Sequence, residues 1–221
     1  MITLYDYELS GNCYKLRLLM SLLDVPFERV PVNFFPGREH KGDAFLKINP
    51  LGQLPVVDDG EVRLRDAQAI LVYLASRYDP SRRWFPDDAP TRGRILAWLA
   101  VAEDITRSAS AARLHDTFGY PCDVDRCRAD ARRIFAHLDD TLADGEIEGR
   151  RWLAADHATV ADLACFPYVA LAPEGGIALD DYPALRRWVR RVRGLPRFIG
   201  MPGIFAPGID LPPQPLAKEP S

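Results

Sequence analysis

The sequence has few cysteines and histidines, and neither residue type is arranged as a metal site or a disulfide framework. The four cysteines, Cys13, Cys122, Cys127 and Cys165, include no C-x-x-C pair, and none of the four histidines stands at a zinc-ligand spacing from a cysteine. We therefore expect no metal ion and a location in a reducing compartment, the cytoplasm.

Strong net charge and long apolar runs are also lacking. The formal net charge is −3 and the pI is about 5.8, whereas a general nucleic-acid-binding protein is usually basic. No apolar run approaches the roughly 20 residues that a membrane-spanning helix needs. Residues 1–6 lack the basic and long apolar regions of a signal peptide. We expect neither a nucleic-acid partner nor a membrane span.

Apolar residues, in contrast, are abundant enough for a core, at 48% hydrophobic against 27% charged over 221 residues. This length suits one large domain or two small ones. Strand and helix signals alternate over residues 1–79 and predict a small α/β domain, which a proline-rich linker follows at 80–90. Residues 91–200 predict an all-helical domain, and the Pro/Gly-rich tail 201–221 is expected to be extended or disordered.

Three local signals organise the helical region. An apolar stripe that begins at Ile95 predicts one long helix from Thr91 to about Leu114. The pair Asp144-Gly145 predicts the end of the next helix. The segment Thr159–Asp162 fits the capping-box pattern ahead of a further apolar helix.

The segment 49–78 carries the first functional signal. Pro55 precedes the apolar pair Val56-Val57, as expected at the start of a strand. If the Leu54–Pro55 bond is cis, the backbone N–H and C=O of Leu54 point to solvent and can pair with another backbone, as in strand addition. A trans proline in an ordinary edge strand is the alternative, and only about 5–6% of X–Pro bonds are cis.

A helix start lies close to this strand. Asp66 is placed to cap a helix, whose first N–H groups have no intrahelical partner and form a site for a carboxylate. The segment therefore predicts a site that holds a short peptide by its main chain and by one charged end.

The order of these motifs resembles the cytosolic glutathione transferase family. Residues 45–56 are similar to its F-x-x-x-N-P-x-G-x-V-P-x segment, and residues 64–74 to its L-x-[ED]-S-x-A-I…Y-L segment. Leu4-Tyr5 followed by Ser10–Lys15 resembles bacterial theta-like and nu-like members. The likeness covers roughly residues 1–200 and implies a thioredoxin-like N-terminal domain, an all-α C-terminal domain and a cis Pro55.

The resemblance implies glutathione as the ligand. Leu54 pairs with its cysteinyl backbone, and Asp66 and Ala67 at the helix start hold its γ-glutamyl end. Gln53 and His40 reach its glycine end. The family usually has serine where this chain has Ala67, so a hydroxyl donor to a carboxylate is missing. A hydrogen bond to a charged group contributes about 1.5–3 kcal/mol, and we expect glutathione binding that is weakened but retained.

The start of the first helix is expected to activate the glutathione thiol. Its dipole favours an anion, and Ser10 and Asn12 can donate hydrogen bonds to sulfur. In theta-like members a serine matching Ser10 has this role, and in nu-like members a Thr and an Asn matching Ser10 and Asn12 share it. Cys13 is a third candidate, since a helix N-terminus lowers a thiol pKa, although a packed structural Cys13 is the simpler interpretation.

The second substrate, a small electrophile, is expected between the domains, in a pocket walled by Arg107, Ser108, Ala111 and Phe118. The resemblance also implies a homodimer, in which Asp104 reaches the glutathione ammonium of a neighbouring subunit.

The sequence thus predicts a glutathione transferase. Two alternatives remain open: a glutathione-dependent disulfide reductase or peroxidase with the same site, and a catalytically silent binding protein on the same fold, which Ala67 favours.

Overall fold

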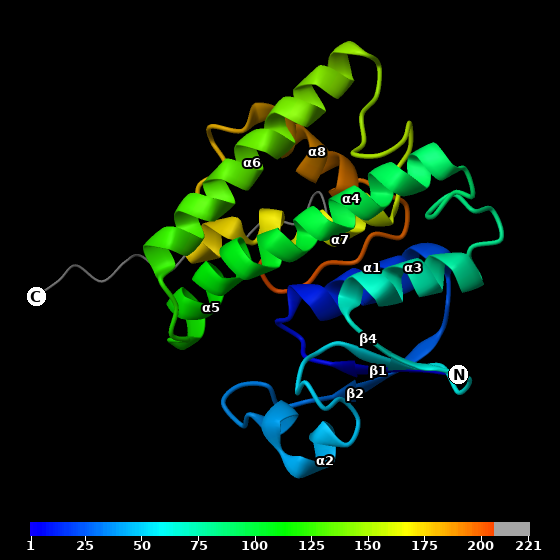
Figure 1. Cartoon of the computed structure of the whole chain (residues 1–221), viewed down its shortest axis with the longest axis vertical. Coiled ribbons are helices and arrows are strands. Elements are labelled where there is room, and N and C mark those ends of the chain that lie inside the picture. Colours follow the sequence, from blue (N-terminus) through cyan, green and yellow to red (C-terminus); the bar gives the residue numbers. More distant parts are fainter. Residues whose placement is uncertain (206–221) are drawn as a thin grey trace, which may run out of the picture.

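Residues 1–205 of this computed structural model are described here (Figure 1). The chain begins with four strands and three helices that form a sheet-bearing part, residues 1–78. The strands are β1 (Ile2–Asp6), β2 (Phe27–Pro31), β3 (Val56–Asp58) and β4 (Arg63–Arg65). The accompanying helices are α1 (Gly11–Leu23), the 3₁₀ turn η1 (Glu39–Lys41), α2 (Asp43–Leu46) and α3 (Ala67–Tyr78).

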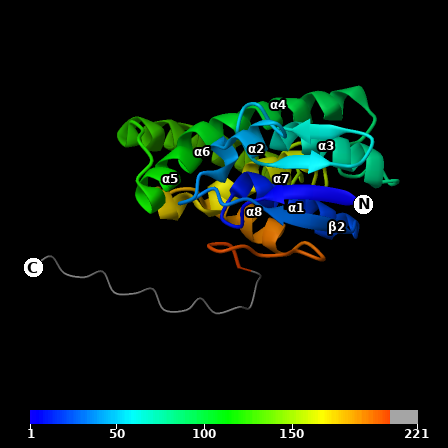
Figure 2. The same ribbon diagram turned by 90° about the horizontal axis from the view of Figure 1, so that it is seen from below.

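The rest of the described chain, residues 79–205, is helical. Its elements are α4 (Ala89–Ile105), the π-helical turn η2 (Thr106–Ser110), α5 (Ala111–Phe118), α6 (Val124–Ile147), α7 (Val160–Ala170), the 3₁₀ turn η3 (Ala172–Gly175) and α8 (Pro183–Arg193). Seen from the side of α2 (Figure 2), this helical part lies behind the sheet and extends past it at α5 and α6.

The sheet has the strand order β2-β1-β3-β4, with β1 and β2 parallel and β3 antiparallel to both of its neighbours. Successive side chains of a strand face opposite sides. Leu4 and Val57 accordingly join the main core beneath α1 and α3, while Tyr5 and Val56 pack with Phe45 of α2 on the other side. The sheet is therefore covered on both faces, as Figure 1 shows.

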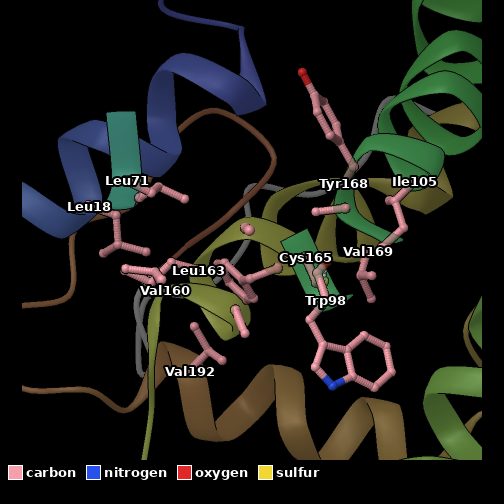
Figure 3. Close-up of a cluster of buried hydrophobic side chains, with 14 of the residues drawn as sticks. Leu18, Leu71, Trp98, Ile105, Val160, Leu163, Cys165, Tyr168, Val169 and Val192 are labelled. Atoms are coloured by element: carbon pink, nitrogen blue, oxygen red, sulfur yellow. Dashed lines mark hydrogen bonds between the residues drawn. The ribbon is translucent and has the colours of Figure 1, made fainter. Parts of the chain in front are cut away.

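Helix α7 is the centre of the helical part. Every residue from Val160 to Val169 is buried, because α7 packs against α1, α3, α4 and α8. Figure 3 shows Val160, Leu163 and Cys165 of α7 among apolar side chains of neighbouring helices. The predicted capping box is confirmed, with the Thr159 side chain accepting from the helix backbone and Asp162 accepting from the Thr159 N–H at 2.9 Å.

Two predicted helix boundaries are wrong. The long helix from Thr91 does not stay α-helical to Leu114, because the π-helical turn η2 interrupts it and the helical run continues to Phe118. Helix α6 does not end at Asp144-Gly145 but continues to Ile147. Gly145 is buried where the chain returns, and its carbonyl accepts from the Arg150 N–H at 2.7 Å.

In the predicted tail, Met201 and Ile204 form an isolated antiparallel bridge. The remainder of that prediction, residues 206–221, falls outside the described residues.

Candidate functional site at the start of helix α1

A cavity of about 190 Å³ lies between the sheet-bearing and helical parts. The sheet-bearing part contributes Tyr7, Ser10, Asn12, Phe34 and Leu54 to its wall. The helical part contributes Thr106, Ser110, Ala111, Arg113, Leu114, Phe118 and Tyr168. The structure therefore brings Ser10, Asn12, Leu54, Ala111 and Phe118 together, as the sequence predicts.

Ser10 is the N-cap of α1. Its Oγ accepts a hydrogen bond from the Cys13 N–H at 3.2 Å, as serine does at this position. The hydroxyl proton is not used in that bond, so Ser10 can still donate to a group in the cavity. The first turn of α1 adds the partial positive charge of a helix N-terminus. Both features favour an anion beside Ser10.

Asn12 lies in the first turn of α1, against Tyr168 of α7. Its backbone N–H donates to the Tyr168 hydroxyl at 3.2 Å, and its side-chain Oδ1 is buried without a hydrogen-bond partner among residues 1–205. A Cβ at the preceding Gly11 would stand 2.6 Å from the Tyr168 ring. Glycine is required there because α1 and α7 approach so closely.

Cys13 is not among the residues that line this cavity. Its side chain is fully buried, and burial, together with the negative charge of Asp6, raises the pKa of its thiol to about 12. A nucleophilic cysteine needs the opposite, a lowered pKa. The environment of Cys13 therefore disfavours a thiolate.

The Leu54–Pro55 bond is cis, as the family resemblance implies. Among residues 1–205 we find no hydrogen-bond partner for the N–H or C=O of Leu54. The side chain of the preceding Gln53 is exposed, while its carbonyl accepts from Asn49 Nδ2 at 2.8 Å. A main-chain donor and acceptor are thus available at the edge of the cavity.

The start of α3 follows Leu54 in the chain, after strands β3 and β4. Asp66 is the N-cap, and its Oδ1 accepts from the Ala69 N–H at 2.9 Å. Its φ of 76° lies in the region that favours glycine, where other residues cost of order 1 kcal/mol or more. Ala67 is buried directly behind it.

Gln68 is a polar residue at this helix start that the sequence analysis did not select. Its Nε2 donates to Glu103 of α4 at 3.1 Å, while its Oε1 is buried without a partner among the described residues. Gln68 thereby links α3 to the helical part beside the predicted γ-glutamyl position.

His40 lies in η1, on the side of the site formed by residues 34–42. Its ring stacks on Phe34 with centroids 4.2 Å apart, and its buried Nδ1 has no partner within residues 1–205. Burial, with the nearby charges of Lys41 and Arg38, lowers the His40 pKa and so favours the neutral ring. The backbone carbonyl oxygen of His40 would be 2.7 Å from a Cβ at Gly52. The turn η1 therefore packs directly on the turn before Gln53.

Arg107 and Ser108 are not in this cavity, which corrects the predicted co-substrate pocket. They line a separate groove between α4 and α6, together with Asp104. Consecutive helical residues point about 100° apart. The cavity wall is instead formed by Thr106, Ser110 and Leu114, which recur every four residues and so share one face.

Tyr168, Ser110 and Phe34 are cavity residues that sequence reasoning missed. Tyr168 follows an apolar run in α7, and a tyrosine buried in such a helix usually needs a partner for its hydroxyl. That signal was available in the sequence. Figure 3 shows Tyr168 at the edge of the apolar cluster with its hydroxyl directed away from it. The signal could not identify Asn12 as the partner, 156 residues earlier in the chain.

Among residues 1–205, no group of three or more His, Cys, Asp or Glu side chains is close enough to hold a metal ion. No helix in the same range is long and apolar enough to cross a membrane.

A mixed four-stranded sheet with a cis-proline before β3, a helical part and a cavity at the start of α1 define a thioredoxin-like fold joined to an α-helical domain. Residues 4–82 match the family model for the glutathione S-transferase N-terminal domain, and residues 116–196 match that for the C-terminal domain. The chain belongs to the glutathione S-transferase family.

The individual relatives carry more than one enzyme name. The chain is 30% identical to human glutathione S-transferase theta-1, over 86% of this chain and 82% of that one. It is also 30% identical to a maleylacetoacetate isomerase of Pseudomonas aeruginosa, over 83% of this chain and 87% of the relative. The crystal structure of a glutathione S-transferase from Pseudomonas fluorescens superposes with a TM-score of 0.82 at 28% identity, covering 90% of this chain and 98% of that one.

Proposed function

We propose that this protein is a glutathione transferase that ionises the glutathione thiol at the start of α1 and presents it to a small electrophile in the adjoining cavity. The observation that carries the proposal is the convergence of three features on one cavity. These are the free hydroxyl proton of Ser10, the N-terminus of α1 and the unpaired backbone of Leu54.

Glutathione fits these features through its main chain and its charged ends. The cysteinyl N–H and C=O pair with the backbone of Leu54 and extend the sheet by one strand. The γ-glutamyl carboxylate meets the N–H groups at the start of α3, and the Asp66 carboxylate meets its ammonium. Gln53 and His40 are assigned to the glycine end. The sulfur then lies toward Ser10 and Asn12.

Ionisation of the sulfur is the chemical step that the protein must favour. A free cysteine thiol has a pKa near 8.5, so little thiolate is present at neutral pH. Ser10 donates its hydroxyl hydrogen bond to the sulfur, and the α1 N-terminus stabilises the developing charge. Asn12 assists through its side-chain amide, because it lies beside Ser10 on the wall of the cavity. Cys13 remains the least favoured candidate, because its pKa is raised to about 12.

The second substrate is assigned to the space bounded by Ala111, Leu114 and Phe118. These side chains are mostly apolar, which favours a small apolar electrophile. Arg107 and Ser108 are no longer part of this assignment. We also propose that residues 1–79 and 91–200 are two domains, and that the protein functions as a cytoplasmic homodimer.

The assignment of Ser10 is tested with Ser10→Ala, Asn12→Ala and Cys13→Ala variants, by measuring glutathione conjugation to an aryl halide. Removal of a donor to developing charge costs about 2.7–4 kcal/mol when it acts in the transition state, so we expect Ser10→Ala to lower kcat about 100-fold. Asn12→Ala should have a smaller effect and Cys13→Ala little effect. Undiminished conjugation by Ser10→Ala would end the assignment.

Glutathione binding itself is tested by calorimetric titration of the wild type and Ala67→Ser. The variant regains the hydroxyl that most family members have, and we expect its dissociation constant to fall about tenfold. If neither protein binds glutathione at millimolar concentration, a catalytically silent protein is the better interpretation.

A glutathione-dependent disulfide reductase is the second candidate, and the position of Asn12 beside Ser10 on the wall of the cavity favours it. Reduction of a small disulfide by the same three variants distinguishes the two functions. If Asn12→Ala impairs disulfide reduction far more than conjugation, the reductase is the better assignment.

A further inference from the structure

Two of the four cysteines lie together at the start of α6, outside the cavity described above. Asp123 caps this helix, and its side chain accepts from the Arg126 N–H. Cys122 therefore occupies the position before the N-cap, and Cys127 the fourth position of the helix. These two positions are the ones whose side chains meet in the hydrophobic staple of a helix N-terminus. The local geometry thus places two thiols in contact.

The hydrogen bonds of the two thiols place them on the same neighbouring helical run. The Cys122 thiol donates to the carbonyl of Ala111 and the Cys127 thiol to the carbonyl of Arg107, each at 3.8 Å. Arg107 and Ala111 are four residues apart, about one helical turn. The two sulfurs are therefore anchored on adjacent turns of the η2–α5 run.

The thiols also interact with each other. Burial raises the pKa of Cys127, and the Cys122 thiol, as a neighbour and hydrogen-bond partner, raises it further. Both side chains are partly exposed, whereas Cys13 and Cys165 are fully buried. The pair at α6 is thus in contact with solvent, and the other two cysteines are not.

We propose that Cys122 and Cys127 form a redox-active dithiol that takes small disulfides as substrates and closes into an intramolecular disulfide across the first turn of α6. This site is separate from Ser10 and Asn12 and does not depend on glutathione binding there.

The reaction proceeds in two exchange steps and needs no other reagent. The Cys122 thiolate attacks one sulfur of the substrate disulfide, forms a mixed disulfide and releases one thiolate, which takes up a proton. Cys127 then loses its proton to solvent, attacks the Cys122 sulfur and releases the second thiol. The protein loses two electrons and two protons, and the substrate disulfide gains both as two thiols. Cys127 acts second because its raised pKa keeps it protonated longer.

The test uses the full chain and bis(2-hydroxyethyl) disulfide, an uncharged probe with no glutathione moiety. Mass spectrometry of the wild type should show the loss of two hydrogen atoms, and peptide mapping without reductant should show Cys122 linked to Cys127. Cys127→Ser should stop at the mixed disulfide, with one mercaptoethanol adduct on Cys122. Cys122→Ser should react more slowly, and the double variant should keep its mass in the native state.

Three results would overturn the proposal: no change in the wild-type mass, adducts on both cysteines without an internal link, or first reaction at Cys13 or Cys165. Ser10→Ala should form the internal disulfide at the wild-type rate. Failure of the proposed glutathione site would be seen in the Ser10 variant with glutathione. Failure of the proposed dithiol would be seen in the Cys122 and Cys127 variants with bis(2-hydroxyethyl) disulfide.

Discussion

Lys15 lies on α1 with its side chain fully buried where α1 packs against α7. Its ammonium is 5.5 Å from the centroid of the Tyr168 ring and has no hydrogen-bond partner among residues 1–205. Burial lowers the Lys15 pKa from the usual 10.5 to about 8, while the nearby Cys165, Glu103 and Asp66 oppose this shift. The charged form is therefore destabilised in the folded protein.

The pH range of this cost follows from the two pKa values. Below pH 8 the lysine is charged in both the folded and the unfolded chain, so the cost of burying the charge is fully present. Between about pH 8 and pH 10.5 the folded protein releases the proton while the unfolded chain keeps it. The contribution of Lys15 to the free energy of unfolding therefore increases with pH in this range.

We predict that Lys15→Met raises the free energy of unfolding at pH 7 by about 3 kcal/mol, since each pKa unit corresponds to about 1.4 kcal/mol. The advantage of the variant over the wild type should shrink as the pH rises from 8 toward 10. Urea denaturation at pH 7 and at pH 10 measures both effects, and Lys15→Arg is the matched control that keeps the charge. A Lys15→Met protein less stable than the wild type at pH 7 would show that the ammonium is stabilised where it lies.

At the scale of the helices, the start of α7 carries a capping box in which Thr159 and Asp162 take part. Asp162 is fully buried, and burial raises its pKa, although the hydrogen bonds it accepts oppose this. Its carboxylate accepts from Trp188 Nε1 at 2.8 Å, from the Thr159 N–H at 2.9 Å and from the Leu153 N–H at 3.1 Å. The Thr159 hydroxyl also donates to it at 3.3 Å, so removing the carboxylate leaves four buried donors without this acceptor.

We predict that Asp162→Ala lowers the free energy of unfolding by at least about 3 kcal/mol, because a buried group left unsatisfied costs about 1–3 kcal/mol. Thr159→Ala removes the other half of the capping box and one of the donors to Asp162, and it should cost about 1 kcal/mol. Urea denaturation of both variants gives the comparison. Equal losses in the two variants would mean that the contacts to Trp188 and Leu153 contribute nothing.

Helix starts were predictable from the sequence because a cap acts on residues three or four positions away. Asp66 and the Thr159–Asp162 box carry that information locally, and the structure agrees with both. The π-helical turn at Thr106–Ser110 has no such signal, since an i→i+5 turn is usually selected by the surroundings at a functional site. The wrong assignment of Arg107 and Ser108 to the cavity has the same origin. Which side chains of η2 face the cavity depends on the helix against which η2 packs, and the local sequence does not specify that helix.

At the scale of the whole molecule, Arg113 connects the helical part to the loop before Ser10. It is buried, and it donates to the Leu9 carbonyl at 2.8 Å and to Glu174 at 2.5 Å. We predict that Arg113→Met lowers the free energy of unfolding by about 2 kcal/mol and raises the KM for glutathione, because Leu9 directly precedes Ser10. Urea denaturation and steady-state kinetics measure the two effects.

Glu174→Gln is the matched control for Arg113→Met. It removes the negative charge, keeps an acceptor for the guanidinium, and leaves the contact of Arg113 with Leu9 intact. It should lower stability less than Arg113→Met and leave the KM unchanged. If both variants raise the KM equally, the bond to Leu9 is not what positions the loop.

The last prediction concerns assembly of the protein into a homodimer. Asp104 is exposed on α4 and lines the groove toward α6, not the cavity beside Ser10. If it binds the glutathione ammonium, it does so most directly in a neighbouring subunit. We predict a sedimentation mass twice the 24.8 kDa of one chain. Asp104→Ala should weaken glutathione binding about tenfold, as the loss of one charge-assisted hydrogen bond does, with Asp104→Asn intermediate. A monomer that binds glutathione equally well with and without Asp104 would exclude this arrangement.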